Sequence, residues 1–168
     1  MPRLFVTVWP PDDVVGELTS LPRKDQRGVR FVPPENWHIT LRFLGEADVD
    51  DVATALDAAV FEPATVGLGP AVDVLAGRAL IVPASGLERL AASVTAVTRT
   101  IGERPRPRFV GHLTLARLSP KAQLPAAIGA RFDAGFDVDE VALVQSRLHP
   151  DGARYETLHT WPVPQGGG

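Results

Sequence analysis

Cysteine is absent from this 168-residue chain, and lysine is rare, because arginine supplies 15 of the 17 basic residues. A chain without cysteine has no thiol nucleophile, no cysteine-ligated zinc site and no disulfide framework. This composition is compatible with a reducing compartment, so we expect a cytoplasmic protein. Its length lies within the usual range of a single domain and is sufficient to bury a core without covalent cross-links.

Long apolar runs and strong positive charge are also missing. The apolar run at 4–9 is cut off by two prolines and two aspartates, which makes it too short for a signal peptide or a membrane span. We therefore expect no membrane association. The net charge of −3 lacks the positive field of a protein that grips long nucleic acid through many phosphates. If RNA is a partner, a short end is the expected target.

Apolar periodicity and turn residues predict several strands mixed with about three helices. Expected strands cover 4–9, 29–32, 37–44, 66–75, 78–82, 110–118, 140–148 and 153–160. Expected helices cover 12–21, 49–60 behind an Asp48 N-cap, and the segment from a Ser85–Glu88 capping box to Gly102, with a short helix or turn at 124–130. This order indicates an α+β fold. We expect one domain over 1–163 and a disordered tail over 164–168.

A short repeat carries most of the chemistry. Arg30–Val32 precedes His38–Leu41, and Arg108–Val110 precedes His112–Leu115, so each half has an Arg-Phe-Val segment followed by His-x-Thr-Leu. Side chains alternate across a strand, and each motif therefore directs its histidine and threonine to one face. If the two strands lie near each other under a pseudo-two-fold relation, two imidazoles and two hydroxyls converge on one site.

Such a site is suited to cleavage at phosphorus. An imidazole has an unperturbed pKa of about 6.5, so one ring can serve as an acid and its partner as a base near neutral pH. One histidine removes a proton from attacking water, the other protonates the leaving ribose oxygen, and the threonine hydroxyls hold the non-bridging oxygens. This chemistry requires no metal and no cofactor.

Other interpretations are weaker. Neither motif has a nearby carboxylate or cysteine, so the two histidines make a poor ligand set for zinc or iron. The serines lack the flanking glycines of a nucleophile elbow. The histidines could instead be hydrogen-bonded strand residues, or the site could bind a nucleotide without turning it over.

The residues resemble the 2H phosphoesterase superfamily, and most closely the bacterial RNA 2′,3′-cyclic phosphodiesterases once called 2′-5′ RNA ligases. The similarity runs almost end to end. It covers the opening RLFVTVWPP, the first motif in FVPPENWHITLRFLGE, the second in HLTLARL, and the closing VALVQSRLHPDGARYETLHTWPV.

The resemblance implies a bilobed, pseudo-two-fold arrangement of antiparallel sheets with helices on the outside and an active cleft between the lobes. It also implies that His38 donates a proton to the leaving 3′ oxygen, that His112 activates water, and that Thr40 and Thr114 hold the phosphate. The substrate would be a short or tRNA-like RNA with a 2′,3′-cyclic phosphate end, the product a 2′-phosphomonoester, and the protein a monomer. The same site could support reversible 2′-5′ ligation of RNA or hydrolysis of small cyclic nucleotides.

Three further residues are candidate substrate contacts. Arg42 lies two residues beyond Thr40 and so on the same expected strand face. Arg117, three residues beyond Thr114, should point away on a regular strand, although the resemblance keeps it in the site. Tyr155 follows a Pro-Asp-Gly turn in a hairpin that either borders the cleft or closes the sheet.

The sequence departs from the family pattern just before the second motif. Relatives commonly have proline there, whereas this chain has Gly111. We expect the glycine to loosen the backbone that directs His112.

Overall fold

The structure, a computed structural model, describes residues 1–166. They form ten strands and three α-helices. The strands are β1 (Arg3–Val8), β2 (Val29–Phe31), β3 (Ile39–Glu46), β4 (Thr65–Leu68), β5 (Asp73–Leu75), β6 (Ala79–Ser85), β7 (His112–Leu118), β8 (Ala134–Asp137), β9 (Glu140–His149) and β10 (Gly152–Pro162). The helices are α1 (Asp12–Leu18), α2 (Val49–Asp57) and α3 (Glu88–Thr98), with a short 3-10 helix at Pro34–Asn36.

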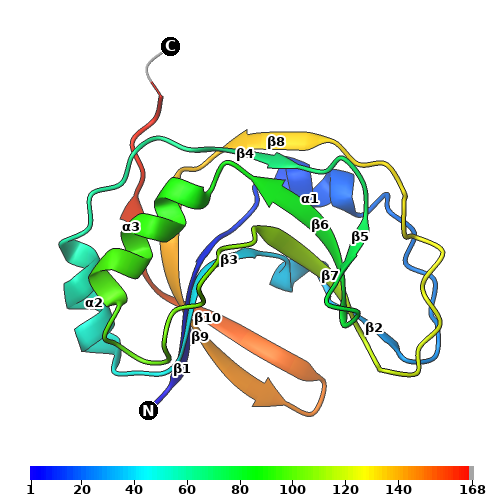
Figure 1. Cartoon of the computed structure of the whole chain (residues 1–168), viewed down its shortest axis with the longest axis horizontal. Helices are drawn as coiled ribbons and strands as arrows, with labels where there is room; N and C mark the ends of the chain where they lie inside the picture. Colours follow the sequence, from blue (N-terminus) through cyan, green and yellow to red (C-terminus); the bar gives the residue numbers. More distant parts are fainter. Residues whose placement is uncertain (167–168) are drawn as a thin grey trace.

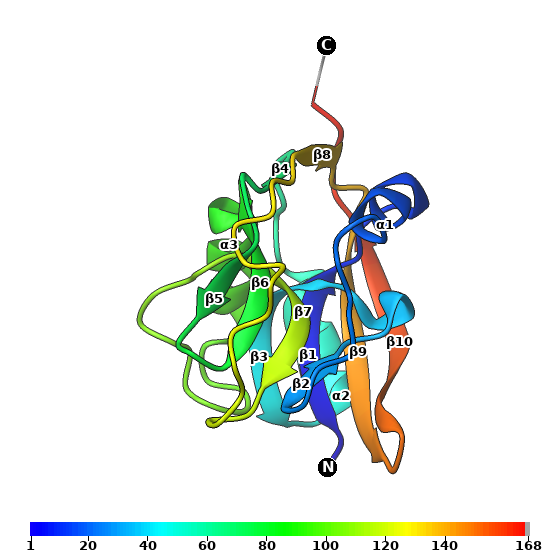
Figure 2. The same cartoon turned by 90° about the vertical axis from the view of Figure 1, so that its right-hand side faces the viewer.

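One curled antiparallel sheet joins two lobes. Its strand order is β10-β9-β1-β3-β7-β6-β4-β8, with β2 paired to β7 and β5 paired to β6. The first lobe contains β1, β3, β9 and β10, the second contains β4 to β8 with β2, and they meet where β3 pairs with β7 (Figure 1). The long β9–β10 hairpin extends beside β1 and β2 (Figure 2). The predicted α+β class with antiparallel sheets is confirmed.

The helices pack on the outside of this sheet because each has an apolar face. Val52 and Leu56, four residues apart on α2, are fully buried, and α2 contacts both α3 and β10. The predicted Asp48 cap is confirmed, since its carboxylate accepts a hydrogen bond from the Asp51 N–H at 3.0 Å. Among the described residues, no helix is long and apolar enough to cross a membrane.

Three sequence predictions differ from the structure. The capping box is wrong, because Ser85 belongs to β6 and its hydroxyl donates to the Gly67 carbonyl at 3.3 Å. The single strand expected over 66–75 is two strands, β4 and β5, interrupted at Gly69-Pro70. Strand β8 was not predicted; its sequence AGFD is short and weakly apolar.

The core is divided unequally between the faces of the first-lobe sheet. The main core holds most of the buried apolar side chains of both lobes, including Trp37 and Ile39. A second, smaller cluster on the other face consists of Phe5, Ala142 and Val144, with Trp9, Phe43 and Tyr155 packed against it. This small aromatic cluster borders the candidate site.

The expected C-terminal tail lies only partly in the described region. Within 164–166, the Gln165 side-chain amide donates to the Val138 carbonyl at 3.0 Å. Residues 167 and 168 lie outside the described residues.

Candidate two-histidine active site

The two His-x-Thr motifs meet where the lobes join. Strands β3 and β7 pair at Ile39 and Leu113, the central residues of the two motifs, and both are fully buried in the main core. Continuing this antiparallel register by one residue sets His38 across from Thr114, and Thr40 across from His112. The structure therefore brings all four polar side chains to one face of the sheet, around a local two-fold axis through the Ile39–Leu113 pair.

The two imidazoles are held by equivalent contacts. His38 Nδ1 lies 2.7 Å from the Asn36 carbonyl, and His112 Nδ1 lies 2.8 Å from the Val110 carbonyl, in each case two residues earlier. A carbonyl only accepts, so each Nδ1 carries its hydrogen and donates it. Each Nε2 is therefore left for chemistry, and that of His38 lies 3.1 Å from the Thr40 hydroxyl.

His38 lies among aromatic rings from the small cluster. Its ring centroid is 4.9 Å from Phe5, 5.6 Å from Trp9 and 5.3 Å from Tyr155, the last in an edge-to-face arrangement. Burial is the main cause that lowers the pKa of His38 from 6.5 to about 4; the hydrogen bond to Asn36 opposes the shift, and the positive charges of Arg117 and His112 add to it. In the free protein, His38 is therefore neutral near pH 7.

Arg42 is not at this site, contrary to the sequence prediction. Thr7 pairs with Thr40 but Val6 pairs with Arg42, so a β-bulge at Leu41 breaks the alternation of β3. Arg42 consequently points to the opposite face and is buried. Its guanidinium donates to the carbonyls of Phe43, Thr98, Ile101 and Glu103, at 2.8 to 3.2 Å, and to the Thr98 hydroxyl. Through these bonds, the Arg42 side chain caps the C-terminal end of α3.

A matching bulge in β7 has the opposite effect on Arg117. Ile81 pairs with Thr114 and Leu80 with Ala116, so Leu115 is the extra residue, at the same motif position as Leu41. The bulge turns Arg117 onto the Thr114 face, where its charge acts on the pKa values of His38 and Tyr155. Regular alternation would have directed Arg117 away from the site. Its observed position therefore differs from the one expected for a strand without a bulge.

Tyr155 lies beside His38 on β10. Burial raises the pKa of its phenol above the ordinary value, and the nearby charge of Arg117 opposes that shift. The hydroxyl is therefore protonated at neutral pH and available as a donor. Of the two roles considered for this hairpin, bordering the site agrees with the position of Tyr155.

Gly111 is tightly packed, in contrast to the expected loosening. Its carbonyl accepts a hydrogen bond from the Ala84 N–H at 3.0 Å. A β-carbon on Gly111 would collide with the Ala84 carbonyl oxygen. The glycine thus allows the segment before His112 to lie directly against β6, which fixes that segment.

Sequence reasoning missed the surroundings of His38. Phe5 in β1 and Trp9 just after it are four residues apart, so strand alternation could have suggested that both side chains point the same way, but not that His38 lies against them. Asn36 left no signal, because the group that orients His38 is its backbone carbonyl.

The fold and the paired His-x-Thr strands define a 2H phosphoesterase. The model of the family described as LigT like Phosphoesterase matches residues 8–68 and 81–155, and the chain belongs to this family. A curated relative from Archaeoglobus fulgidus, named RNA 2′,3′-cyclic phosphodiesterase, is 30% identical over 95% of this chain and 99% of its own length. A relative from Thermus thermophilus with the same name is 32% identical over 96% of this chain and 90% of its own length.

Solved structures agree with this assignment. The crystal structure of a Thermus thermophilus protein has a TM-score of 0.78 and 28% identity, covering 98% of this chain and 100% of that one. Escherichia coli LigT complexed with 3′-AMP has a TM-score of 0.75 and 24% identity, covering 98% of this chain and 99% of that one. The second likeness shows the fold alone.

Proposed function

We propose that this protein hydrolyses the 2′,3′-cyclic phosphate end of RNA to a 2′-phosphomonoester, without a metal ion. The observation that carries the proposal is the pairing of the two motifs at Ile39 and Leu113, with both Nδ1 atoms hydrogen-bonded to carbonyls. In the proposed complex, the two Nε2 atoms approach one phosphate from opposite sides. The names of the relatives in the family, RNA 2′,3′-cyclic phosphodiesterase, support the substrate.

In this mechanism the two histidines have different roles. His112 Nε2 accepts a proton from water as the water oxygen attacks phosphorus. The bond between phosphorus and the ribose 3′ oxygen breaks, and His38 Nε2 donates its proton to that oxygen, leaving the phosphate on the 2′ oxygen. The hydroxyls of Thr40 and Thr114 donate to the non-bridging oxygens, where charge accumulates.

The low pKa of His38 makes its role as an acid depend on the substrate. With a pKa of about 4, roughly one molecule in a thousand carries the proton at pH 7. A phosphate anion about 4 Å away contributes about 4 kcal/mol at an effective dielectric constant of about 20. This equals roughly three pKa units, enough to protonate about half of the His38 rings in the complex. Substrate binding thereby creates the acid that the reaction needs.

The function is tested with a short oligonucleotide that ends in a 2′,3′-cyclic phosphate, incubated with EDTA. We expect conversion to a 2′-phosphate, and His38→Ala and His112→Ala should each lower kcat by about 10²–10⁴-fold. His159→Ala is the matched control, since His159 is an exposed histidine on β10 next to Trp161 and outside the site. Absence of turnover in the wild type, or full activity in either site variant, would contradict the proposal.

The assignment of the two roles requires a second experiment. A diester with a 4-nitrophenolate leaving group needs little protonation, so it removes the demand for a general acid. Such a substrate should restore most of the rate lost in His38→Ala and little of that lost in His112→Ala. The reverse pattern would exchange the two roles and leave the reaction itself intact.

A further inference from the structure

A groove of about 290 Å³, lined by both polar and apolar side chains, opens next to Tyr155 and Arg117. One wall is β2 with the turn after it, from Arg30 to Asn36, and the other is the end of the β9–β10 hairpin, from Leu148 to Ala153. Arg117 and Tyr155 belong both to this groove and to the surroundings of His38. The groove is therefore continuous with the candidate active site.

Two arginines face each other in this groove. Arg30 on β2 pairs directly with Arg117 on β7, and both side chains are exposed. Like charges at directly opposed positions of a ladder destabilise a sheet. Within residues 1–166 neither guanidinium forms an ion pair with a carboxylate.

The other opposed arginine pair of the sheet is arranged differently. Arg147 and Arg154 are also direct partners, between β9 and β10, but Glu156 lies 3.6 Å from Arg147. A carboxylate thus compensates the charge of that pair. The uncompensated charge at Arg30 and Arg117 is the charge that an anionic ligand would neutralise.

The two arginines lie at different distances from the chemistry. The charge of Arg117 acts on His38, whereas Arg30 makes no comparable contribution. Arg30 instead reaches towards the hairpin turn, where a β-carbon on Gly152 would lie 3.2 Å from its guanidinium. Arg117 is therefore the arginine near the scissile phosphate, and Arg30 lies farther along the groove.

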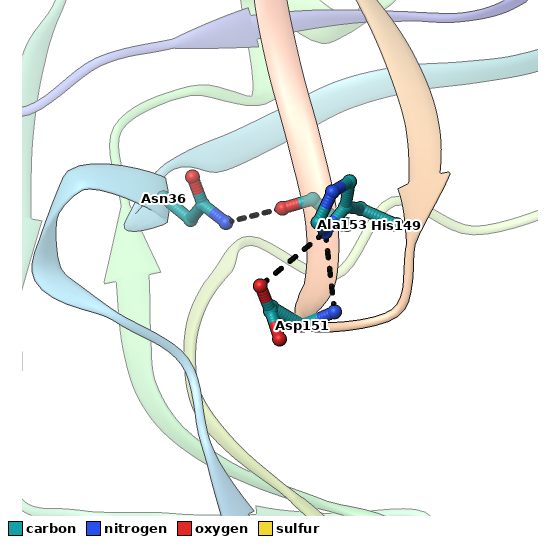
Figure 3. A network of polar contacts seen from close by, with 4 residues as sticks. All are labelled: Asn36, His149, Asp151 and Ala153. Carbon is teal, nitrogen blue, oxygen red and sulfur yellow. Dashed lines mark hydrogen bonds and ion pairs between the residues drawn. The ribbon is translucent and has the colours of Figure 1, made fainter.

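The hairpin wall is held in place by polar contacts. Asn36 Nδ2 donates to the Ala153 carbonyl at 2.9 Å, which links the turn before His38 to the start of β10 (Figure 3). On the hairpin turn, the Asp151 N–H donates to His149 Nδ1 at 3.3 Å (Figure 3). The Asn36–Ala153 bond thus links the two walls of the groove directly.

We infer that Arg30 forms a second anion subsite, which binds the phosphodiester preceding the cyclic end of an RNA strand. The inference rests on the proposed function for its choice of ligand. The terminal nucleoside then spans the groove between Arg117 and Arg30. A free nucleoside 2′,3′-cyclic phosphate lacks that second phosphate. Arg30 therefore distinguishes an RNA strand from this small molecule.

The test compares adenosine 2′,3′-cyclic phosphate with the same compound carrying a 5′-phosphate. In the wild type, the 5′-phosphate should raise kcat/KM by about tenfold, the effect of one hydrogen-bonded charge contact. Arg30→Gln should reduce this ratio to about one. Arg154→Gln removes the same charge from a position on β10 between two groove residues but outside the groove, and should keep the wild-type ratio.

Binding provides a readout that does not depend on turnover. A dinucleotide ending in a 2′-phosphate is titrated at several salt concentrations, and Arg30→Gln should reduce the slope of log affinity against log salt by about 0.7. If the wild type hydrolyses neither cyclic compound, this slope alone decides the subsite, and the oligonucleotide assay decides the proposed function. A ratio or slope that is the same in Arg30→Gln and wild type overturns the inference, even where hydrolysis is observed.

Discussion

The buried imidazole of His38 makes the stability of the protein depend on pH. Its pKa is about 4 in the folded chain, against about 6.5 in an unfolded one. Between these values the unfolded chain binds a proton at this position and the folded chain does not. Folding stability from this group is therefore fully present above about pH 6.5, and is lost as the pH falls towards 4.

The size of the loss is set by the two pKa values. From pH 7.5 to pH 5.0, the unfolded chain becomes almost fully protonated at His38, while about one folded molecule in ten does. The free energy of unfolding should fall by about 2 kcal/mol over this interval through His38 alone. Continued acidification to about pH 3 raises the loss to about 3 kcal/mol, beyond which both states bind the proton.

Urea unfolding at pH 7.5 and pH 5.0 measures this contribution by comparison. His38→Gln cannot titrate, so its free energy of unfolding should fall by about 2 kcal/mol less than that of the wild type. His159→Gln removes an exposed histidine and should follow the wild type. If the wild type and His38→Gln lose equal stability between the two pH values, the aromatic rings do not keep this imidazole neutral, and His38 does not depend on the substrate for its proton.

Three other predictions concern charge and packing around the site. Saturating inorganic phosphate should raise the pKa of His38 from about 4 to about 7 in an NMR titration of the imidazole, and an unchanged value would contradict the proposed origin of the acid. Arg42→Met leaves the buried carbonyls at the end of α3 without donors and should lower the free energy of unfolding by about 3 kcal/mol. As a control, Arg99→Met at an exposed position should change this free energy by at most about 0.5 kcal/mol. Gly111→Ala places a β-carbon against the Ala84 carbonyl and should cost about 1–3 kcal/mol in the same measurement, while Gly16→Ala, at an open position of α1, should not be destabilising.

Sequence reasoning predicted the parts of the fold that local patterns determine. Alternating apolar residues located most strands, and the Asp48 cap located the start of α2. The α+β class and the antiparallel sheets are confirmed. The Ser85 cap failed because the pairing of β6 continues through Ser85, and no pattern within the segment reveals that pairing.

Side-chain direction was harder to predict than strand position. Regular strand alternation puts Arg42, two residues after Thr40, in the site and Arg117, three residues after Thr114, outside it. The bulges reverse both placements. A bulge is defined by the partner strand, so a single-strand pattern does not contain it. The pKa of His38 was unpredictable for the same reason, since its aromatic neighbours come from β1 and β10.

The two bulges also place different side chains at equivalent positions of a symmetric frame. Because each bulge falls on the leucine of its motif, the residue that returns to the site face is the third after threonine, Phe43 in β3 and Arg117 in β7. The first lobe thereby adds Phe43 to the small aromatic cluster, and the second adds a cation whose charge acts on His38. An imidazole beside apolar rings is neutral until an anion arrives, whereas a guanidinium attracts that anion. The two motifs are equivalent, but the proposed acid, His38, lies against Phe5, Trp9 and Tyr155, and the asymmetry of the site therefore comes from the strands around the motifs.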